Sequence, residues 1–401
     1  RHAGRVELVG GAVRDILLGG TPRELDVVVE DGVRDLAREL AASLEGELTL
    51  HERFGTAVVS SETADIDLAT MRAETYSAPG ALPDVTPGTP EQDLARRDFT
   101  VNAIALGLAG EQAGQIRAAE GAIEDLGSRR LAVLHKGSFR DDPTRILRLA
   151  RYAVRLAIFG FRVDDHTAAL AEEALREGAL HTVSGERLGA ELRLAMRERD
   201  AVASLAEFER MGILRAWEPG VSFDPAATRI ALQLLPRDGS VALTLAGALL
   251  LEMCDYLDKE RTEPAIRGFL HDLALPAGVG DKAFGVAVTA SVAITRLARS
   301  DTTSDLLEVT VGAPVESLAL AGGVCEVDEG PDSYGKRLAE EWIDDRRHVK
   351  LEVTGDDLIA AGVPEGPEVG VRLEESYKLL LEERIAPGRE SELRAALEAR
   401  I

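Results

Sequence analysis

The sequence predicts an α+β fold, in which a mixed β-sheet comes first and helices follow. Strand and helix patterns alternate as far as about residue 109, whereas helical periodicity dominates from Asp142 onward. A chain of 401 residues is long enough for two to four domains of roughly 100 to 200 residues each. We therefore expect a mixed-sheet head over residues 1–140 and three helical parts over residues 141–200, 201–345 and 346–401.

A glycine turn joins the first expected strand to the first expected helix. Residues 5–9 have the composition of a short strand and residues 12–18 that of a helix. Gly10 and Gly11 between them let the backbone turn sharply and approach a ligand closely. A helix N-terminus behind such a turn favours anions, and Arg14 adds a cation. The segment therefore predicts a site for a phosphate-bearing ligand.

Closely spaced carboxylates lie on the next expected strands. Residues 25–29 form an apolar run typical of a buried strand, and strand residues two apart share a face, so Glu24 and Asp26 project together. Asp65 and Asp67 alternate in the same way, and Asp67 completes the set from a neighbouring strand. Two divalent ions commonly occupy such a site where a phosphoryl or nucleotidyl group is transferred. Taken singly, the turn and the acidic pair also fit an ordinary turn and a solvated strand edge.

Arginine and asparagine are concentrated over residues 93–105. This segment contains Arg96-Arg97-Asp98-Phe99-Thr100 followed by Asn102-Ala103. Its pattern predicts a capped helix, with Asp98 as the N-cap and Val101, Ile104 and Ala105 at helical spacing. Such a cap would also hold the preceding arginine in place.

Three arginines recur along the next expected helix. Asp142 suits the N-cap and Pro143 the first helical position. Arg145, Arg148 and Arg151 follow at intervals of three, opposite apolar residues that can enter the core. This arginine face is either a solvated surface or a binding surface for planar bases and phosphates, which suit the guanidinium group.

Charge and composition narrow the class of protein. The formal net charge of −24 disfavours diffuse attraction to a polyanion, so nucleic-acid binding would depend on local arginine-rich faces. No stretch is apolar enough to span a membrane and no signal-peptide pattern is present, so we expect a cytoplasmic protein without a membrane partner. Cys254 and Cys325 are too isolated for a metal motif and fit a reducing compartment.

Taken in order, these segments resemble the class II tRNA nucleotidyltransferase (CCA-adding) and bacterial poly(A) polymerase family. The resemblance is dense over about the first 160 residues and again over about residues 353–385, where Thr354-Gly355 and Gly366-Pro367 are similar to the family's tail. It implies a polymerase-β-type head followed by a helical neck, body and tail. It also implies template-independent addition of CMP and AMP, from CTP and ATP, to the tRNA 3′ end, with the tail helping to hold the tRNA.

The resemblance also implies roles for individual residues. Glu24 and Asp26 would bind two Mg²⁺ ions, and Asp67 would help to place the metal or the nucleophile. Asp142 would accept a hydrogen bond from the base's exocyclic amine and Arg145 would donate to its Watson–Crick edge, which selects C and A. The other nucleotide-binding positions would be Gly10, Gly11, Arg14, Arg97, Asn102, Arg148 and Arg151.

Three features qualify this interpretation. The family normally has Asp where this chain has Glu24, and the extra methylene moves the carboxylate by about 1.5 Å. Residues 72–92 form a Pro- and Gly-rich interruption, and the family has a flexible segment there that helps to position nucleotides. In residues 184–197, Glu186-Arg187 and Glu191-Leu192 resemble a family helix in which we expect local ion pairs. An A-adding enzyme, a CC-adding enzyme, a poly(A) polymerase and a catalytically impaired RNA-binding module therefore remain alternatives.

Overall fold

The computed structural model describes residues 4–22, 24–51, 55–255, 259–275, 278–297 and 310–399. Two compact units divide the chain. The first contains residues 1–199 and 207–217, and the second contains residues 200–206 and 218–401. The weakly marked helical pattern expected over residues 200–340 includes stretches outside the described residues. The four-part division expected from the sequence stays a prediction.

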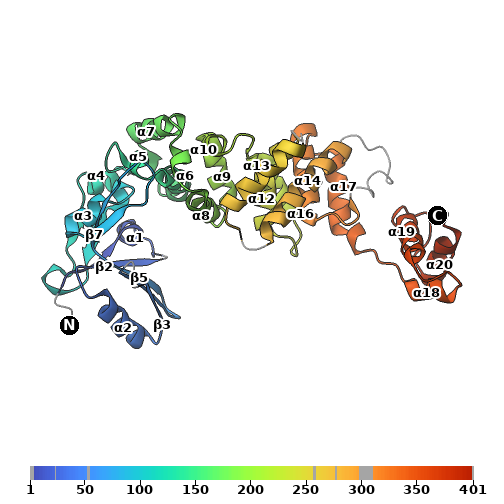
Figure 1. The fold of residues 1–401 in the computed structure, drawn as a ribbon, viewed down its shortest axis with the longest axis horizontal. Coiled ribbons are helices and arrows are strands. Elements are labelled where there is room, and N and C mark those ends of the chain that lie inside the picture. The colour runs from blue at the N-terminus through green and yellow to red at the C-terminus, as the bar shows by residue number, and fades with distance from the viewer. Residues whose placement is uncertain are drawn as a thin grey trace. The chain divides into compact units, whose positions relative to one another are not determined.

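A seven-stranded mixed sheet forms the centre of the first unit, in the order β3-β4-β5-β2-β1-β8-β9 (Figure 1). Its β2–β5 pair is parallel and its other pairs are antiparallel. This sheet, followed by helices, confirms the expected α+β fold. The strands are β1 (Val6–Val9), β2 (Leu25–Val29), β3 (Glu47–His51), β4 (Thr56–Ser60), β5 (Asp65–Thr70), β8 (Ile104–Gly107) and β9 (Ile116–Ala118).

The sequence pattern of the first elements explains how they pack. All four residues of β1 are buried, including Glu7, whose carboxylate accepts from Arg117, and the last three residues of β2 are buried as well. Val9, Val28 and Ala105 form a core cluster with Met71 and Leu94. Asp26 lies two residues before Val28 and therefore on the same face of the sheet as this cluster. The helices α1 (Gly11–Leu17) and α2 (Val33–Leu44) connect the first three strands.

The Pro- and Gly-rich interruption is an ordered β-hairpin rather than an irregular loop. Strand β6 (Arg72–Thr75) pairs antiparallel with β7 (Asp84–Pro87). All four residues of β7 are exposed, so the hairpin lacks the alternating apolar pattern from which a strand is recognised. The Gly80 N–H at its tip donates to the Arg140 carbonyl oxygen at 3.1 Å. This contact holds the tip of the hairpin against the segment before the arginine-rich helix.

The prediction of a capped helix after Asp98 is wrong. A 3₁₀ turn, η2 (Thr100–Asn102), follows the short helix α3 (Pro90–Ala95), and the chain then enters β8. The apolar residues Ile104 and Ala105 are buried in the sheet, where continuous burial on both faces produces a run that resembles a helix pattern. The Asp98 carboxylate instead accepts from the backbone N–H of Phe99 and from the Asn102 side chain, so it stabilises the turn.

Helices complete the first unit. The arginine-rich helix α6 (Thr144–Ala157) begins at Thr144, whose backbone N–H donates to Asp142 Oδ1 at 3.1 Å, as a cap would require. The helix expected within residues 184–197 is α8 (Gly185–Ala195). The remaining elements are η3 (Gly110–Gln112), α4 (Ala122–Gly127), β10 (Arg130–Leu131), α5 (Ser138–Asp141), β11 (Arg162–Val163), α7 (Asp165–Arg176), η4 (Ala179–Thr182), α8 (Gly185–Ala195), α9 (Ala201–Arg210) and α10 (Ile213–Trp217). The division between the units runs through α9.

The second unit is helical throughout its described residues. No described helix of the chain combines the length and the apolarity that a membrane span needs. Cys254 and Cys325 are both buried. The helices are α11 (Pro225–Leu234), α12 (Val241–Asp255), α13 (Lys259–Asp272), α14 (Val279–Leu297), α16 (Val315–Glu329), α17 (Tyr334–Asp344), η5 (Arg346–His348), α18 (Gly355–Ala360), α19 (Pro367–Leu381) and α20 (Arg389–Glu398).

Candidate active site

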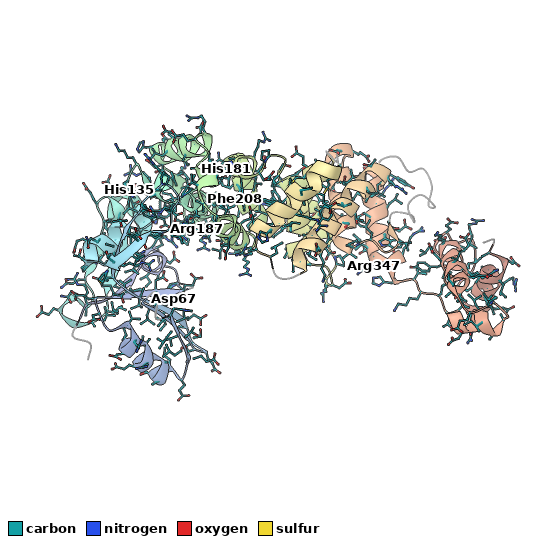
Figure 2. All side chains as sticks on the ribbon, in the orientation of Figure 1. Asp67, His135, His181, Arg187, Phe208 and Arg347 are labelled. Atoms are coloured by element: carbon teal, nitrogen blue, oxygen red, sulfur yellow. The ribbon has the colours of Figure 1, made fainter. Side chains whose placement is uncertain are left out.

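The carboxylates expected from two separate segments meet on adjacent strands. Asp26 on β2 and Asp67 on β5 are direct Cα partners in the parallel pair. Figure 2 labels Asp67 on this sheet. Residues paired in this way project from the same face. Glu24 immediately precedes β2, and its charge acts on both Asp26 and Asp67. The three predicted acidic residues therefore share one region of the sheet.

This acidic group destabilises its own ionised form. Burial, followed by the charges of Asp67 and Glu24, raises the pKa of Asp26, although the Arg97 guanidinium opposes the shift. Burial together with Glu24 and Asp65 raises the pKa of Asp67. Like charges on one face of a sheet repel when they are ionised. A cation is the ligand that would relieve this repulsion.

The donor set fits Mg²⁺ that is shared with a nucleotide. Within the described residues, no group of three or more His, Cys, Asp or Glu side chains is arranged to hold a metal ion by itself. Mg²⁺ usually takes one or two protein carboxylates and completes its shell with water and substrate phosphate oxygens. Asp26 and Glu24 provide such oxygens, and Asp67 lies beside Asp26. These residues could therefore hold Mg²⁺ once a triphosphate is present.

The glycine turn lies against these carboxylates. Gly10 has a φ of 73°, in the left-handed region that suits glycine. A Cβ atom at this position would lie 3.0 Å from Arg97 Nη1 and 3.6 Å from Asp26 Oδ2. Gly10 is therefore needed for its conformation and for the close approach of Arg97 to the acidic residues. The Arg97 Nη2 donates to Asp93 Oδ2 at 3.0 Å, while its buried Nε has no hydrogen-bond partner among the described residues.

A chain of hydrogen bonds joins the helix behind the glycine turn to α6. Arg14 Nη1 donates to Asn102 Oδ1 at 2.6 Å, and Asn102 Nδ2 donates to Asp98 Oδ1 at 2.9 Å. Arg148 donates to Asp98 Oδ2 from Nε at 2.8 Å and from Nη2 at 2.6 Å. Burial alone would raise the pKa of Asp98, but Arg148 and the hydrogen bonds lower it to about 2. Asp98 is therefore an ionised link between two predicted nucleotide-binding arginines.

Asp142 and Arg145 lie beside the hairpin. Arg145 is buried, and it donates to Ser138 Oγ and to the Arg96 carbonyl oxygen, each at 2.7 Å. Asp142 Oδ1 accepts from the Thr144 hydroxyl at 2.6 Å and from Arg187 Nη2 at 2.9 Å. Burial raises the pKa of Tyr76 to about 12 against the opposing charge of Arg145, with Glu74 and Asp142 adding to the rise, so its phenol stays neutral. These interactions hold the proposed base-reading pair in fixed positions.

The arginine face of α6 is not a solvated surface. Arg145 and Arg151 are each 5% exposed. Arg151 donates to Glu191 at 3.0 Å and to Glu198 at 3.1 Å, and Arg148 also reaches Glu191. The ion pairs expected within the Glu186–Leu192 segment are likewise not local, because Glu191 binds arginines of α6. Packing of α8 against α6 explains this difference, since it brings opposite charges together across the contact.

The sequence patterns do not assign four residues to the site: Tyr152, Arg155, Glu198 and Arg187, the last of which is expected only in local ion pairs. Arg187, labelled in Figure 2, joins the hairpin to Asp142. Its Nη1 donates to the Gly80 carbonyl oxygen and its Nη2 to Asp142 Oδ1, each at 2.9 Å. Arg155 pairs with Glu198, which also binds Arg151. Tyr152 lies among the arginines of the site. A signal for Arg155 is present, since it follows Arg151 by one helical turn, whereas Glu198 is visible only through long-range contacts.

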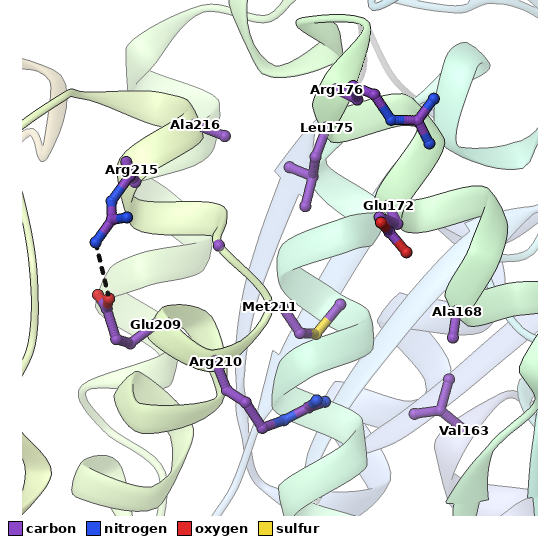
Figure 3. A pocket seen from close by; sticks show the side chains of 11 residues that line it. Val163, Ala168, Glu172, Leu175, Arg176, Glu209, Arg210, Met211, Arg215 and Ala216 are labelled. Carbon is purple, nitrogen blue, oxygen red and sulfur yellow. Dashed lines mark ion pairs between the residues drawn. The ribbon is translucent and has the colours of Figure 1, made fainter.

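A cavity of about 740 Å³ lies elsewhere in the first unit (Figure 3). It opens between α7 and residues 209–216, and Arg215 Nη2 lies 4.0 Å from Glu209 Oε1 at its edge. Of the described residues that line it, none belongs to the predicted set. The candidate active site is therefore located by its carboxylates and arginines and not by the size of a cavity.

Known proteins share both sequence and fold with this chain. The family described as the poly A polymerase head domain matches residues 6–132. The chain is 33% identical to an A-adding tRNA nucleotidyltransferase of Geobacter sulfurreducens, over 98% of this chain and 45% of the relative. It is 39% identical to an A-adding tRNA nucleotidyltransferase of Halalkalibacterium halodurans, over 52% of this chain and 49% of the relative. It is 38% identical to a CC-adding tRNA nucleotidyltransferase of Deinococcus radiodurans, over 49% of this chain and 52% of the relative. The chain thus spans about half the length of the curated relatives that it matches.

Solved structures extend the likeness to the whole fold. A CCA-adding enzyme in its apo form II has a TM-score of 0.81 at 26% identity, covering 98% of this chain and 91% of that one. A CCA-adding enzyme in complex with ATP has a TM-score of 0.79 at 25% identity, with coverages of 98% and 91%. The Thermotoga maritima CCA-adding enzyme complexed with tRNA has a TM-score of 0.74 at 25% identity over the same shares.

Proposed function

We propose that the chain is a class II tRNA nucleotidyltransferase that transfers nucleotides to the 3′ end of tRNA, as supported by the match of residues 6–132 to the poly A polymerase head domain and by the likeness to tRNA nucleotidyltransferases. The observation that carries this proposal is the pairing of Asp26 with Asp67 beside the glycine turn and Arg97. Those groups suit a nucleoside triphosphate and its metal ions. The substrates are then a tRNA 3′ end and CTP or ATP.

In this proposal each group has a separate task. Glu24 and Asp26 would hold Mg²⁺. When bound, the metal would lower the pKa of the RNA 3′-hydroxyl and stabilise negative charge on the transferred phosphoryl group. Asp67 places the metal or the nucleophile from the neighbouring strand. Gly10, Gly11 and Arg14 bind the triphosphate at the N-terminus of α1, with Arg97 beside it.

The second set of groups reads the base. The Asp142 carboxylate accepts from an exocyclic amine, and the Arg145 guanidinium donates to the Watson–Crick edge. Cytosine and adenine both carry such an amine, whereas uracil lacks one. Solved CCA-adding enzymes of similar fold are in complex with ATP and with CTP. Arg148, Arg151 and Asn102 hold the neighbouring groups in place.

Addition of the terminal AMP is the specific reaction that we propose first. Two of the relatives described above are A-adding enzymes, and one of them aligns with 98% of this chain. Addition of the complete CCA end is the second candidate, favoured by the likeness to CCA-adding enzymes over nearly the whole fold. A long hairpin at residues 72–87 argues against a CC-only enzyme, because we expect such enzymes to have a shortened segment there.

The helical parts bind the tRNA in this proposal. The net charge of −24 disfavours diffuse attraction to RNA, so we expect tRNA affinity to come from local basic groups and to fall as salt is added. We propose that residues 346–401 help to hold the tRNA; a solved enzyme of similar fold is complexed with tRNA.

One assay separates these reactions. Purified protein is incubated with tRNA lacking CCA, with CC-ended tRNA and with an oligo(A) primer, each with labelled ATP or CTP. We expect AMP incorporation on CC-ended tRNA alone. CMP and AMP on the tRNA lacking CCA would instead identify a CCA-adding enzyme, and extension of oligo(A) a poly(A) polymerase. Absence of metal-dependent nucleotide binding, with tRNA binding retained, would identify an impaired RNA-binding module and overturn the proposal.

A further inference from the structure

Four guanidinium groups surround the ring of Tyr152. The guanidinium carbons of Arg14, Arg148, Arg151 and Arg155 lie 5.5, 5.8, 5.6 and 5.6 Å from its centroid. Tyr152 itself is 9% exposed. Cations are attracted to an aromatic face within about 6 Å of the centroid. The ring is therefore an uncharged centre around which four like charges are arranged.

Several carboxylates restrain the arginines, some of them shared by two arginines, but Tyr152 is the group that all four contact. Arg148 binds Asp98, while Arg151 and Arg155 both bind Glu198. These hydrogen bonds use the edges of the planar guanidinium groups. The faces remain for an aromatic neighbour, and an aromatic ring fills the space between them without adding charge or competing donors.

Tyr152 also connects all three segments of the candidate site. Arg14 comes from the helix behind the glycine turn, whereas Arg148 comes from α6. Phe99, from the segment that contains Arg97, packs edge-on against the Tyr152 ring with centroids 5.6 Å apart and an interplanar angle of 81°. One side chain thus contacts α1, the segment that contains Arg97, and α6.

We propose that Tyr152 is a positioning residue for the bound nucleotide, and this inference rests on the proposed nucleotidyl transfer. Its ring holds Arg14 at a fixed separation from Arg148, so that the helix behind the glycine turn keeps one geometry relative to α6, the helix that carries Arg145. The hydrogen-bond chain through Asn102 and Asp98 acts in parallel with the ring. The π electrons of the ring perform this role, and the phenol hydroxyl is dispensable.

Fluorinated side chains at position 152 separate electrostatic attraction from packing. Phenylalanine with one, two or three ring fluorines keeps the shape of Phe while the negative charge of its face decreases. Affinity for a non-hydrolysable ATP or CTP with Mg²⁺ is measured by calorimetry. We expect the nucleotide affinity of Tyr152→Phe to stay within about twofold of the wild type. The trifluorinated ring should weaken binding by about three- to tenfold, and the rings with one and two fluorines should give intermediate affinities that fall in that order. Equal affinities along the series would overturn the inference.

A second comparison separates positioning from a general loss of stability. Tyr152→Leu removes the ring, and we expect KM for the nucleotide to rise by about tenfold with a smaller change in kcat. Phe161→Leu is the matched control, because Phe161 is also buried and has the Arg129 guanidinium carbon 5.5 Å from its centroid, outside the candidate site. We expect this control to lower Tm without changing KM. An equal rise of KM in the control would contradict the positioning role.

The two proposals fail differently. A wild-type protein that is inactive on every primer would overturn nucleotidyl transfer. A wild type that is active while the fluorinated series binds nucleotide with constant affinity would overturn only the role of Tyr152. If Tyr152→Leu does not fold, the fluorinated series still decides, because each of its members retains an aromatic ring of nearly the same size as Phe.

Discussion

Asp26 and Asp67 are direct partners across the parallel β2–β5 pair, so two carboxylates from distant parts of the chain share one face of the sheet. Burial raises the pKa of each; the charges of Asp67 and Glu24 add to the shift at Asp26, and those of Glu24 and Asp65 add to the shift at Asp67. An arrangement that stabilised only the fold would not keep these charges together. The pairing therefore points to a cationic ligand, and the predictions below start from it.

Removal of the Asp26 carboxylate should nearly abolish activity. We expect Asp26→Asn to lower the rate of AMP or CMP incorporation by at least about a thousandfold, because the metal loses a ligand. Asp65→Asn is the control, since Asp65 is exposed on the same strand as Asp67 and is not paired with Asp26. We expect it to stay within about threefold of wild type. Substantial activity in Asp26→Asn would refute the metal assignment.

Glu24 can be tested by restoring the side chain that the family normally has. We expect Glu24→Asp to retain or increase incorporation, because a shorter carboxylate still supplies a metal ligand beside Asp26. Glu24→Gln keeps the length but removes the charge, and should lower incorporation by at least about a hundredfold. Rates are measured over a Mg²⁺ titration for all three proteins. Similar rates for wild type and Glu24→Gln would remove Glu24 from the site.

Neutralising Asp67 should stabilise the protein in the absence of metal. A raised folded pKa means that Asp67 contributes stability below its unfolded pKa and loses it as pH rises through the folded pKa. At neutral pH the ionised group is therefore unfavourable, and Asp67→Asn should raise Tm by about 1–3 °C. Scanning calorimetry with EDTA measures this gain, which should shrink as pH is lowered toward the ordinary Asp pKa. A lower Tm at neutral pH would contradict the repulsion described here.

Arg187 should influence which nucleotide is chosen. It bridges the Gly80 carbonyl oxygen at the hairpin tip and the Asp142 carboxylate. We expect Arg187→Ala to change the ratio of kcat/KM for ATP and CTP by about tenfold, because Asp142 loses a charged hydrogen bond. Arg197→Ala, on an exposed residue after the same helix, is the control and should leave the ratio unchanged. If both variants leave it unchanged, the hairpin and base reading are not coupled through Arg187.

Asp98 should be important for the stability of the first unit. Asp98→Ala leaves the guanidinium of Arg148 without its principal partner, so we expect the free energy of unfolding in urea to fall by about 3 kcal/mol. Glu207→Ala breaks a pair with Arg210, which is 68% exposed, and should change the free energy of unfolding by less than about 0.5 kcal/mol. Equal losses of unfolding free energy in both variants would show that the Asp98–Arg148 pair stabilises the protein no more than an exposed ion pair does.

Local sequence patterns predict many of the elements that carry the site. Strand β2 begins and ends where its apolar run does, and the glycine turn lies between β1 and α1 as expected. The helix expected after Asp98 and the irregular loop at residues 72–92 are wrong. In both cases tertiary contacts determine the secondary structure, because a buried strand and an exposed hairpin have no distinctive periodicity in the sequence.

The sequence by itself determines the α+β class and the residue types from which a nucleotide site can be built, because glycine turns, strand alternation and helix caps depend on near neighbours along the chain. Only the tertiary structure decides that Asp67 pairs with Asp26, that Asp98 joins Arg148 to Asn102, and that the α6 arginines are buried against acidic residues. Those relationships depend on strand register and helix packing. Both are set by burial of the whole unit, and no local pattern specifies them.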